Sequence, residues 1–193
     1  MADRHQFRAK WHDYNGGIYF ITVCSHEKHH LFGRIIDEST CTVGTRFIAS
    51  ALGEIVEEHI KNIPKHYRNV EILNHVVMPN HIHFVINIEV AYTTQSSDKV
   101  PVNTGCLKGP KHGEGCPDRH HNSKLATIIG AFKAGVTRTA RTARTARTRR
   151  IASLQVWQSR YHEHIIRNQR AFDKIMAYID SNVENWSKDC FAE

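Results

Sequence analysis

Two histidines stand one residue apart in the stretch VVMPNHIHFVI, residues 76–86. The stretch is otherwise apolar and rich in strand-forming residues, and a Met-Pro-Asn break precedes His81 and His83. Because residues two apart in a strand share a face, both imidazoles point to one side of the sheet and their apolar neighbours point to the other. Imidazole is a common ligand of divalent transition metals, so the pair could hold an ion. Two histidines satisfied by backbone or water are the alternative that this spacing leaves open.

A tyrosine and an asparagine near the end of the chain could share a cleft with such an ion. The stretch QRAFDKIMAYIDSNVENW, residues 169–186, has apolar residues at helical spacing through Trp186 and predicts a core-facing helix. Tyr178 and Asn182 are four residues apart at the border of its apolar face, so they are neighbours on the helix. A tyrosine that only packs, and an asparagine that only marks a helix end, are the alternatives.

The strands that position the histidines follow from composition and turn signals. IYFITVCS, residues 18–25, predicts a buried strand, and LFGRII, residues 31–36, is expected to continue the sheet. NVEILNHVVM, residues 69–78, and HIHFVINI, residues 81–88, flank a Pro-Asn turn signal. These two runs predict an antiparallel hairpin.

Two further runs predict helices. TRFIASALGEIVEEHIKNIPK, residues 45–65, spaces apolar residues from Phe47 to Ile60 at helical intervals and is expected to stop before Pro64. KLATIIGAFKAGV, residues 124–136, predicts a second amphipathic helix. The order is therefore strand, helix, hairpin, helix, helix, within a single domain over residues 1–193.

Two segments do not fit a packed core. Residues 89–123 are rich in Gly, Pro, Ser, Asn and Lys, and predict a flexible insertion. Residues 137–150 form a basic low-complexity repeat of period three without an acidic residue. On a helix, arginines at this spacing would be distributed around the surface and would not line one side. The repeat therefore supplies positive charge but no apolar face for packing. Its arginines are candidate phosphate contacts: Arg138, Arg141, Arg144, Arg147, Arg149 and Arg150.

Composition restricts the setting of the protein. The formal charge is +7 and the pI about 9.3, which favours a polyanionic partner, and most of the excess charge lies in the repeat. The sequence contains no apolar run of membrane-spanning length and begins with charged residues, so we expect neither a membrane span nor a signal peptide. Five cysteines without framework spacing fit free thiols. A cytoplasmic protein is the expectation.

Three motifs in this order resemble a known family, the HUH single-tyrosine transposases that act on single-stranded DNA, and especially their REP-associated tyrosine transposase branch. The motifs are VVMPNHIHFVI, VWQSRYHEHIIRN and AYIDSN, in which a Tyr precedes an Asn by four residues. An early strand followed by LFG, and a helix containing AFK, support the resemblance. The similarity covers residues 12–88 and 123–187.

The resemblance implies a role for each matching residue. His81 and His83 would be paired metal ligands, Asn182 a third ligand and Tyr178 the nucleophile. The metal would be Mg²⁺ or Mn²⁺, of which Mn²⁺ better matches nitrogen ligands. The reaction would be nicking and strand transfer of single-stranded DNA through a 5′-phosphotyrosine intermediate, at hairpin-forming repeat ends. Relatives act as homodimers or as monomers.

The resemblance also implies the fold. It would be α+β, an antiparallel sheet with helices packed on one face, as in ferredoxin-like and RRM-like domains. One departure concerns Asn182, because Val183 stands where the branch often has Pro. The insertion and the repeat have no counterpart in the family, so no family role is carried onto them.

Other residues offer competing interpretations. Tyr161 is a rival nucleophile beside Glu163, which is a candidate neighbour of the site. A zinc site in the insertion is disfavoured because no Cys-x₂-Cys pair occurs among its candidates, which are Cys106, His112, Cys116, His120 and His121. A single-stranded nucleic-acid-binding module without catalysis, and a metal-dependent phosphodiesterase in which water attacks, remain alternative functions.

Overall fold

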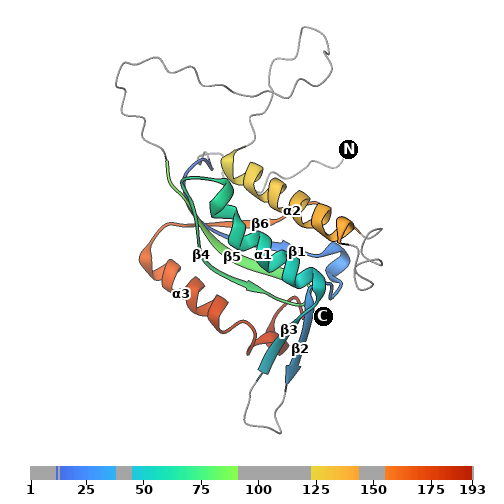
Figure 1. The fold of residues 1–193 in the computed structure, drawn as a ribbon. Helices are drawn as coiled ribbons and strands as arrows, with labels where there is room; N and C mark the ends of the chain where they lie inside the picture. Colours follow the sequence, from blue (N-terminus) through green and yellow to red (C-terminus); the bar gives the residue numbers. More distant parts are fainter. Residues whose placement is uncertain (1–11, 13, 38–44, 91–122, 144–154, 193) are drawn as a thin grey trace, which may run out of the picture.

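A four-stranded antiparallel sheet forms the centre of the fold (Figure 1). The computed structural model describes residues 12, 14–37, 45–90, 123–143 and 155–192. The sheet order is β4-β5-β1-β6, and a separate two-stranded sheet pairs β2 with β3. The elements are β1 (Gly17–Cys24), η1 (His26–Lys28), β2 (Gly33–Asp37), β3 (Thr45–Ala49), α1 (Ala51–His66), β4 (Val70–Val77), β5 (His81–Ile88), α2 (Lys124–Thr142), β6 (His162–Ile166), α3 (Gln169–Asp180) and η2 (Trp186–Lys188).

The connections of the main sheet are those of a split βαβ fold. α1 lies between β1 and β4, and α2 lies between β5 and β6. β5 pairs antiparallel with both β1 and β4, and β1 also pairs antiparallel with β6. This βαββαβ arrangement is the ferredoxin-like topology, with the β2-β3 hairpin inserted before α1. The predicted α+β class, the antiparallel sheet and the β4-β5 hairpin are confirmed.

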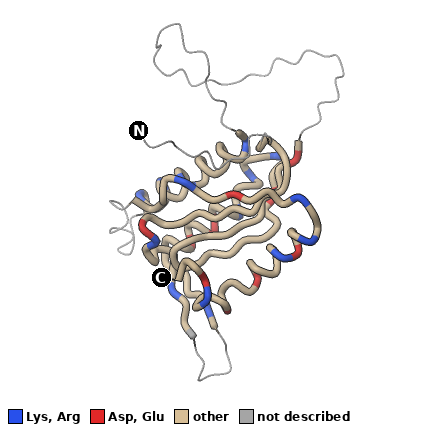
Figure 2. Tube along the Cα trace, turned by 180° about the vertical axis from the view of Figure 1, so that it is seen from behind, with Lys and Arg blue, Asp and Glu red and all other residues tan. Residues whose placement is uncertain are grey.

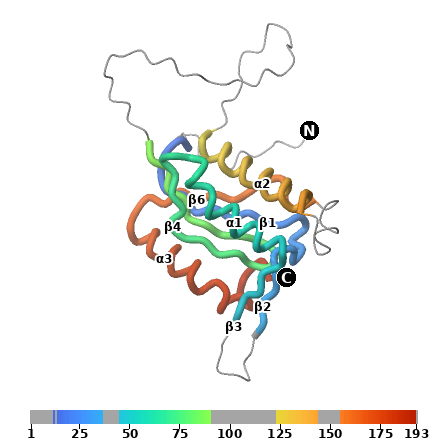
Figure 3. Tube along the Cα trace, viewed as in Figure 1, coloured from blue at the N-terminus to red at the C-terminus, as the bar shows by residue number. Residues whose placement is uncertain are grey.

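α1 and α2 cover one face of the sheet and lie side by side there (Figure 3). The buried side chains of β1 and β5 at alternate positions, such as Ile21 and Phe84, pack with Leu52 and Val56 of α1 and with Ile128 of α2. Alternate strand residues share a face, so the residues between them, which include His83, must point away from this core.

α3 packs against the opposite face of the sheet, which differs from the expectation of helices on one face only. Its Phe172, Ile175, Met176 and Ile179 form a second cluster around Val85 of β5 and neighbouring strand residues. Figure 2, which views the molecule from behind, shows α3 beside the sheet with both acidic and basic residues along it. The apolar stripe of α3 was visible in the sequence, but the stripe does not say which face of the sheet it covers.

The first predicted helix is shorter at its start and longer at its end than expected. Residues 45–49 form β3, because they pair antiparallel with β2. Ala49 lies opposite Gly33, and Thr45 lies opposite Asp37. β2 is consequently part of the small sheet and does not continue the main one. α1 begins after Ser50, whose hydroxyl accepts a hydrogen bond from the Gly53 amide at 3.0 Å. Pro64 lies inside the last turn of α1, where it has no N–H to donate to the carbonyl four residues back, and the helix ends at His66.

α3 ends at Asp180, although the apolar spacing of the sequence continues to Trp186. Trp186 begins η2, and Asn182 lies in the turn between the two elements. α2 includes the first part of the basic repeat, with Arg138 and Arg141 exposed. The other four arginines, and nearly all of the predicted insertion, lie outside the described residues. Among the described helices, none is long and apolar enough to cross a membrane.

We expect Gly53→Ala to destabilise the fold because the close approach of α1 to the backbone before β2 requires the glycine. A Cβ at Gly53 would clash with the backbone carbonyl oxygen of Phe32, which cannot move like a flexible side chain. Crowding of this kind costs about 1–3 kcal/mol of unfolding free energy. Gly130→Ala in α2 is the matched control. It meets no atom within 4 Å, so it should stabilise the helix by about 0.5–1 kcal/mol. Urea unfolding of both variants checks this expectation, and equal stability of the two would contradict it.

Candidate functional site

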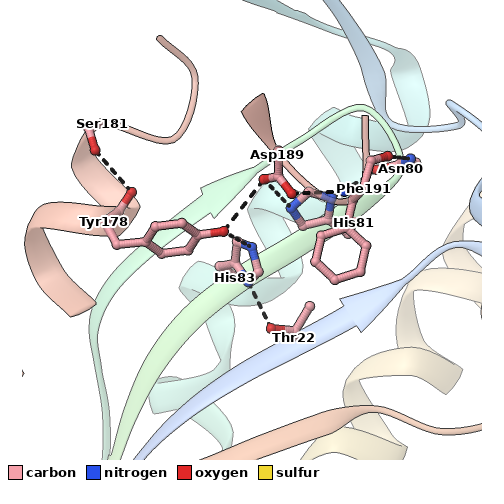
Figure 4. A network of polar contacts seen from close by, with 8 residues as sticks. All are labelled: Thr22, Asn80, His81, His83, Tyr178, Ser181, Asp189 and Phe191. Carbon is pink, nitrogen blue, oxygen red and sulfur yellow. Dashed lines mark hydrogen bonds and ion pairs between the residues drawn. The ribbon is translucent and has the colours of Figure 1, made fainter. Parts of the chain in front are cut away.

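His81 and His83 lie at the start of β5 on the face that α3 partly covers (Figure 4). Their side chains are buried, with 0% of His81 and 2% of His83 exposed. The centroids of the two rings are 4.5 Å apart. The prediction that both imidazoles share one face therefore agrees with the structure.

The ring of His81 has a defined proton position. Its Nδ1 lies 2.9 Å from the side-chain oxygen of Asn80. The amide group of Asn80 is itself oriented, because its nitrogen donates to the backbone oxygen of Phe191 at 2.6 Å. Since the Asn80 oxygen can only accept, Nδ1 of His81 must carry the proton and Nε2 must carry the lone pair. Nε2 is buried and has no hydrogen-bond partner among the described residues.

His83 is held from the neighbouring strand. Its Nδ1 lies 2.9 Å from the hydroxyl oxygen of Thr22, and Thr22 is its direct partner in the β1-β5 register. The ring also stacks on Phe20 with centroids 5.1 Å apart. A hydrogen bond on one ring nitrogen leaves the other nitrogen for a ligand, as in many metal-binding histidines.

Burial keeps both imidazoles neutral. Desolvation lowers the pKa of His81 to about 3, assisted by the positive charge of Lys28. Desolvation also lowers the pKa of His83 to about 3, with a further decrease from His81 and an opposing effect of Asp189. Neutral imidazole is the form that binds a metal ion, so the protein maintains the binding form at physiological pH.

Tyr178 reaches the histidines from α3, as predicted. Its hydroxyl oxygen lies 3.3 Å from Nε2 of His83, although 95 positions separate the two residues in sequence. The side chain is 42% exposed, which leaves the phenol accessible to a large substrate. Burial of the hydroxyl end raises its pKa, and a hydrogen bond with Asn182 partly opposes the increase. The phenol is therefore protonated at neutral pH.

Asn182 lies beside Tyr178 in the turn after α3. It is 3% exposed, and its side-chain oxygen has no hydrogen-bond partner among the described residues. A buried amide oxygen without a partner costs free energy unless a further group binds it. The predicted pairing of Tyr178 with Asn182 is present, and a role of Asn182 as a ligand stays a prediction.

Asp189 was not predicted from the sequence. It follows η2 and places its carboxylate, 5% exposed, next to both the histidines and Tyr178. Its Oδ2 lies 3.8 Å from Nε2 of His81 and 3.5 Å from the hydroxyl of Tyr178, which donates to it. The sequence around it, WSKDCFAE, has no periodicity or motif that distinguishes this acid from a surface residue.

The donor set fits a divalent cation. One potential ligand atom from each of His81, His83 and Asp189 lies within 4.8 Å of the other two. Two neutral nitrogens with a nearby carboxylate are a donor set that suits Mn²⁺ and other first-row metals. The lone pair of His81 without a partner is the observation that favours an ion here.

Four other predicted residues lie away from this cluster. Glu163 pairs with Ile21 in the β1-β6 register and so lies on the α1-α2 face, the wrong side of the sheet for a neighbour of the histidines. Tyr161, the rival nucleophile, packs partly buried against that same core. Arg138 and Arg141 are on α2, which also covers that face. The alternation of side chains along β6 explains why Glu163 is excluded.

Comparison with known proteins finds a relative that covers nearly the whole chain, and more distant solved structures. No protein-family model matches the chain. A protein of Haemophilus influenzae (strain ATCC 51907 / DSM 11121 / KW20 / Rd), described as uncharacterized, is 32% identical over 187 residues, which cover 96% of this chain and 91% of that protein. The chain belongs to the same family as this protein.

Two solved structures are similar at lower identity, and both are described in terms of transposases. One is a REP-associated tyrosine transposase bound to a REP hairpin, with 17% identity, 91% of this chain and 71% of that chain covered, and a TM-score of 0.48. The other is a transposase candidate from Deinococcus radiodurans, with 13% identity, coverage of 90% and 95%, and a TM-score of 0.40.

The buried histidines should make the metal-free protein less stable in acid. An unfolded histidine has an ordinary pKa near 6.5, whereas both folded values are about 3. The unfolded chain thus binds more protons between these values, so this stabilisation is complete above pH 6.5 and is lost as the pH falls toward 3.

We expect the unfolding free energy of His81→Gln/His83→Gln to depend less steeply on pH in this window than that of the unchanged protein. His162→Gln/His164→Gln, which alters two exposed histidines of β6, is the matched control. Urea unfolding at a series of pH values in the presence of a chelator measures the slopes, and identical slopes for all three proteins would contradict the assignment.

Proposed function

We propose that the protein nicks and rejoins single-stranded DNA as a metal-dependent tyrosine transposase, with Tyr178 as the nucleophile. The observation that carries the proposal is the contact of an accessible phenol, 3.3 Å from Nε2 of His83, with a buried pair of neutral imidazoles. A single chain supplies all of these groups, so the proposed site does not require a residue from a second subunit.

The proposed reaction is a transesterification. The phenolic oxygen of Tyr178 attacks the scissile phosphorus, the bond between phosphorus and the 3′ oxygen breaks, and the 3′ oxygen takes up a proton as the phenol loses one. The products are a 5′-phosphotyrosyl strand and a free 3′-hydroxyl. Because one phosphodiester replaces another, the reverse attack by a 3′-hydroxyl can rejoin DNA without ATP.

The phenol needs assistance to react, since burial raises its pKa and keeps it protonated. A divalent cation held by His81 and His83, Mg²⁺ or Mn²⁺, would polarise the phosphate and stabilise the charge that develops in the transition state. The chain itself contributes orientation. Phe20 contacts both the His83 ring and the Tyr178 ring, with centroid distances of 5.1 and 6.1 Å, and so fixes the nucleophile relative to the imidazoles.

The proposed substrate is single-stranded DNA with a hairpin at a repeat end, which is what the motif resemblance implies. The basic repeat would bind its phosphates from the face of the sheet that α1 and α2 cover, near the end of the sheet that carries His81. α2 runs along β1 from its first residue toward its last. The start of α2 bonds to Tyr14 and Asn15, which precede β1. Further along α2, Lys133 bonds to Gln158, and Gln158 bonds to Cys24, the last residue of β1. Arg138 and Arg141 lie still further along the helix, at the end of the sheet where Cys24 pairs with His81.

Two alternative functions use the same fold. A binding module without catalysis would not need a phenol in contact with a metal-binding pair, and a hydrolytic phosphodiesterase would not need Tyr178 to be both exposed and oriented. The contact between Tyr178 and His83 favours the transposase over both.

Tyr178→Phe should abolish covalent capture of DNA and leave DNA binding unchanged, because it removes only the nucleophilic oxygen. The assay incubates the protein with a labelled single-stranded hairpin and Mn²⁺ and looks for an adduct that survives denaturant. Tyr161→Phe is the matched control and should still form the adduct, since Tyr161 packs, partly buried, against the core on the other face of the sheet. Cleavage that persists in Tyr178→Phe would exclude the tyrosine mechanism, and binding without any cleavage would favour the module.

Arg138→Ala/Arg141→Ala should weaken DNA binding to a similar extent for every sequence tested. Each lost phosphate contact is expected to lower the slope of log affinity against log salt by about 1. Lys65→Ala/Arg68→Ala removes two exposed cations at the opposite end of the sheet, where β4 begins, and is the matched control. Fluorescence anisotropy across a salt series measures the slopes, and equal slopes for the two double variants would remove the repeat from the interface.

A further inference from the structure

We infer that the C-terminal segment, residues 186–192, supplies the third protein ligand of the metal centre through Asp189, in place of Asn182. This inference rests on the proposed metal dependence, and it changes the ligand set expected from the family resemblance. It also assigns a metal-binding role to the segment that follows α3.

The first argument is the orientation of His81. Asn80 fixes the proton on Nδ1, so the lone pair of Nε2 faces the Asp189 Oδ2 at 3.8 Å. This separation is too long for a hydrogen bond, and two electron-rich atoms without a proton between them repel each other. A cation bound between the two atoms would remove the repulsion, because each atom would then be a ligand of the cation. Ligand atoms of one cation lie roughly 3–4 Å apart when each bond is about 2.1 Å long, which matches the observed separation.

The second argument is the way the carboxylate is held. Its Oδ1 accepts a hydrogen bond from the Phe191 amide at 2.9 Å, and the Asp189 amide donates to the Trp186 oxygen at 3.0 Å. The other oxygen, Oδ2, is directed toward His81 and Tyr178. One oxygen therefore anchors the side chain and the other is presented to the site, which is the arrangement of a positioned ligand.

The third argument is that one network fixes both the segment and the histidine. Asn80 bonds to His81 with its oxygen and to the Phe191 backbone with its nitrogen. The Phe191 ring lies over the His81 ring with centroids 4.5 Å apart, and the Lys28 ammonium lies 5.5 Å from the Phe191 centroid. The position of Asp189 is thus set by the same asparagine that sets the lone pair of His81.

Charge also distinguishes Asp189 from Asn182. The two imidazoles are neutral, so a divalent cation would be left with its full charge in a buried site if the third ligand were an amide. A carboxylate neutralises half of that charge. Binding of the cation would also stabilise the C-terminal segment against the sheet, because a cation that is coordinated by two parts of a chain holds them together.

The test is Mn²⁺ binding to the metal-free, full-length protein, measured by calorimetry without DNA. Asp189→Asn is the sharpest variant because its side-chain oxygen can still accept from Phe191, while its amide nitrogen cannot bind a cation. We expect a loss of about tenfold or more in Mn²⁺ affinity. Asn182→Ala should change the affinity by less than about threefold. Glu184→Gln is the control for charge, because it removes an exposed acid from the same part of the chain.

A second readout follows the segment itself. Amide hydrogen exchange at residues 186–192 should slow when Mn²⁺ is added to the unchanged protein, and it should not respond to Mn²⁺ in Asp189→Asn. Circular dichroism and thermal unfolding verify that each variant folds.

The outcomes separate this inference from the proposed function. Wild-type affinity or tighter binding in Asp189→Asn would overturn the role of Asp189. An accompanying loss in Asn182→Ala would restore the ligand set of the family. Unchanged affinity in His81→Ala/His83→Ala would instead remove the metal centre, and with it both proposals. Loss of binding in the histidine variant and in Asp189→Asn supports the inference whether or not DNA is cleaved.

Discussion

The hydrogen bonds of one side chain, Asn80, determine how the candidate site is arranged. Its oxygen accepts from His81 and its nitrogen donates to the backbone of Phe191, so a single amide orients both an imidazole and the end of the chain. An amide can satisfy both partners in only one orientation, which fixes the lone pair of His81 toward the site. The neutral state of that ring, maintained by burial, then leaves a donor atom with no hydrogen-bond partner among the described residues.

The two faces of the sheet have different roles. One face buries its apolar side chains beneath α1 and α2, and that core holds β5 in place. The other face carries the histidines, with α3 packed across part of it so that Tyr178 reaches His83. A nucleophile on a helix and ligands on a strand keep their relative positions when both elements are tied to one sheet, which is the rigidity that the proposed transesterification requires.

Local patterns predicted the elements where tertiary pairing did not compete with them. The β4-β5 hairpin and α2 formed as expected, since strand alternation and helical spacing there agree with the packing around them. Phe47 and Ile48 have helical spacing yet lie in β3, because pairing with β2 satisfies the backbone and outweighs a weak helical preference. Val183 and Trp186 continue the spacing of α3 beyond its end at Asp180, where the chain turns to bring η2 and Asp189 to the histidines.

The sequence by itself determined that two imidazoles share a strand face and that Tyr178 and Asn182 are neighbours, because both statements depend only on the repeat distances of strand and helix. Only the tertiary structure decided which face of the sheet α3 covers, that Glu163 lies on the other face, and that Asp189 lies 3.8 Å from His81. Those facts depend on how elements pack and on where an irregular segment ends. Side-chain periodicity carries no information about contacts between residues that are more than a hundred positions apart.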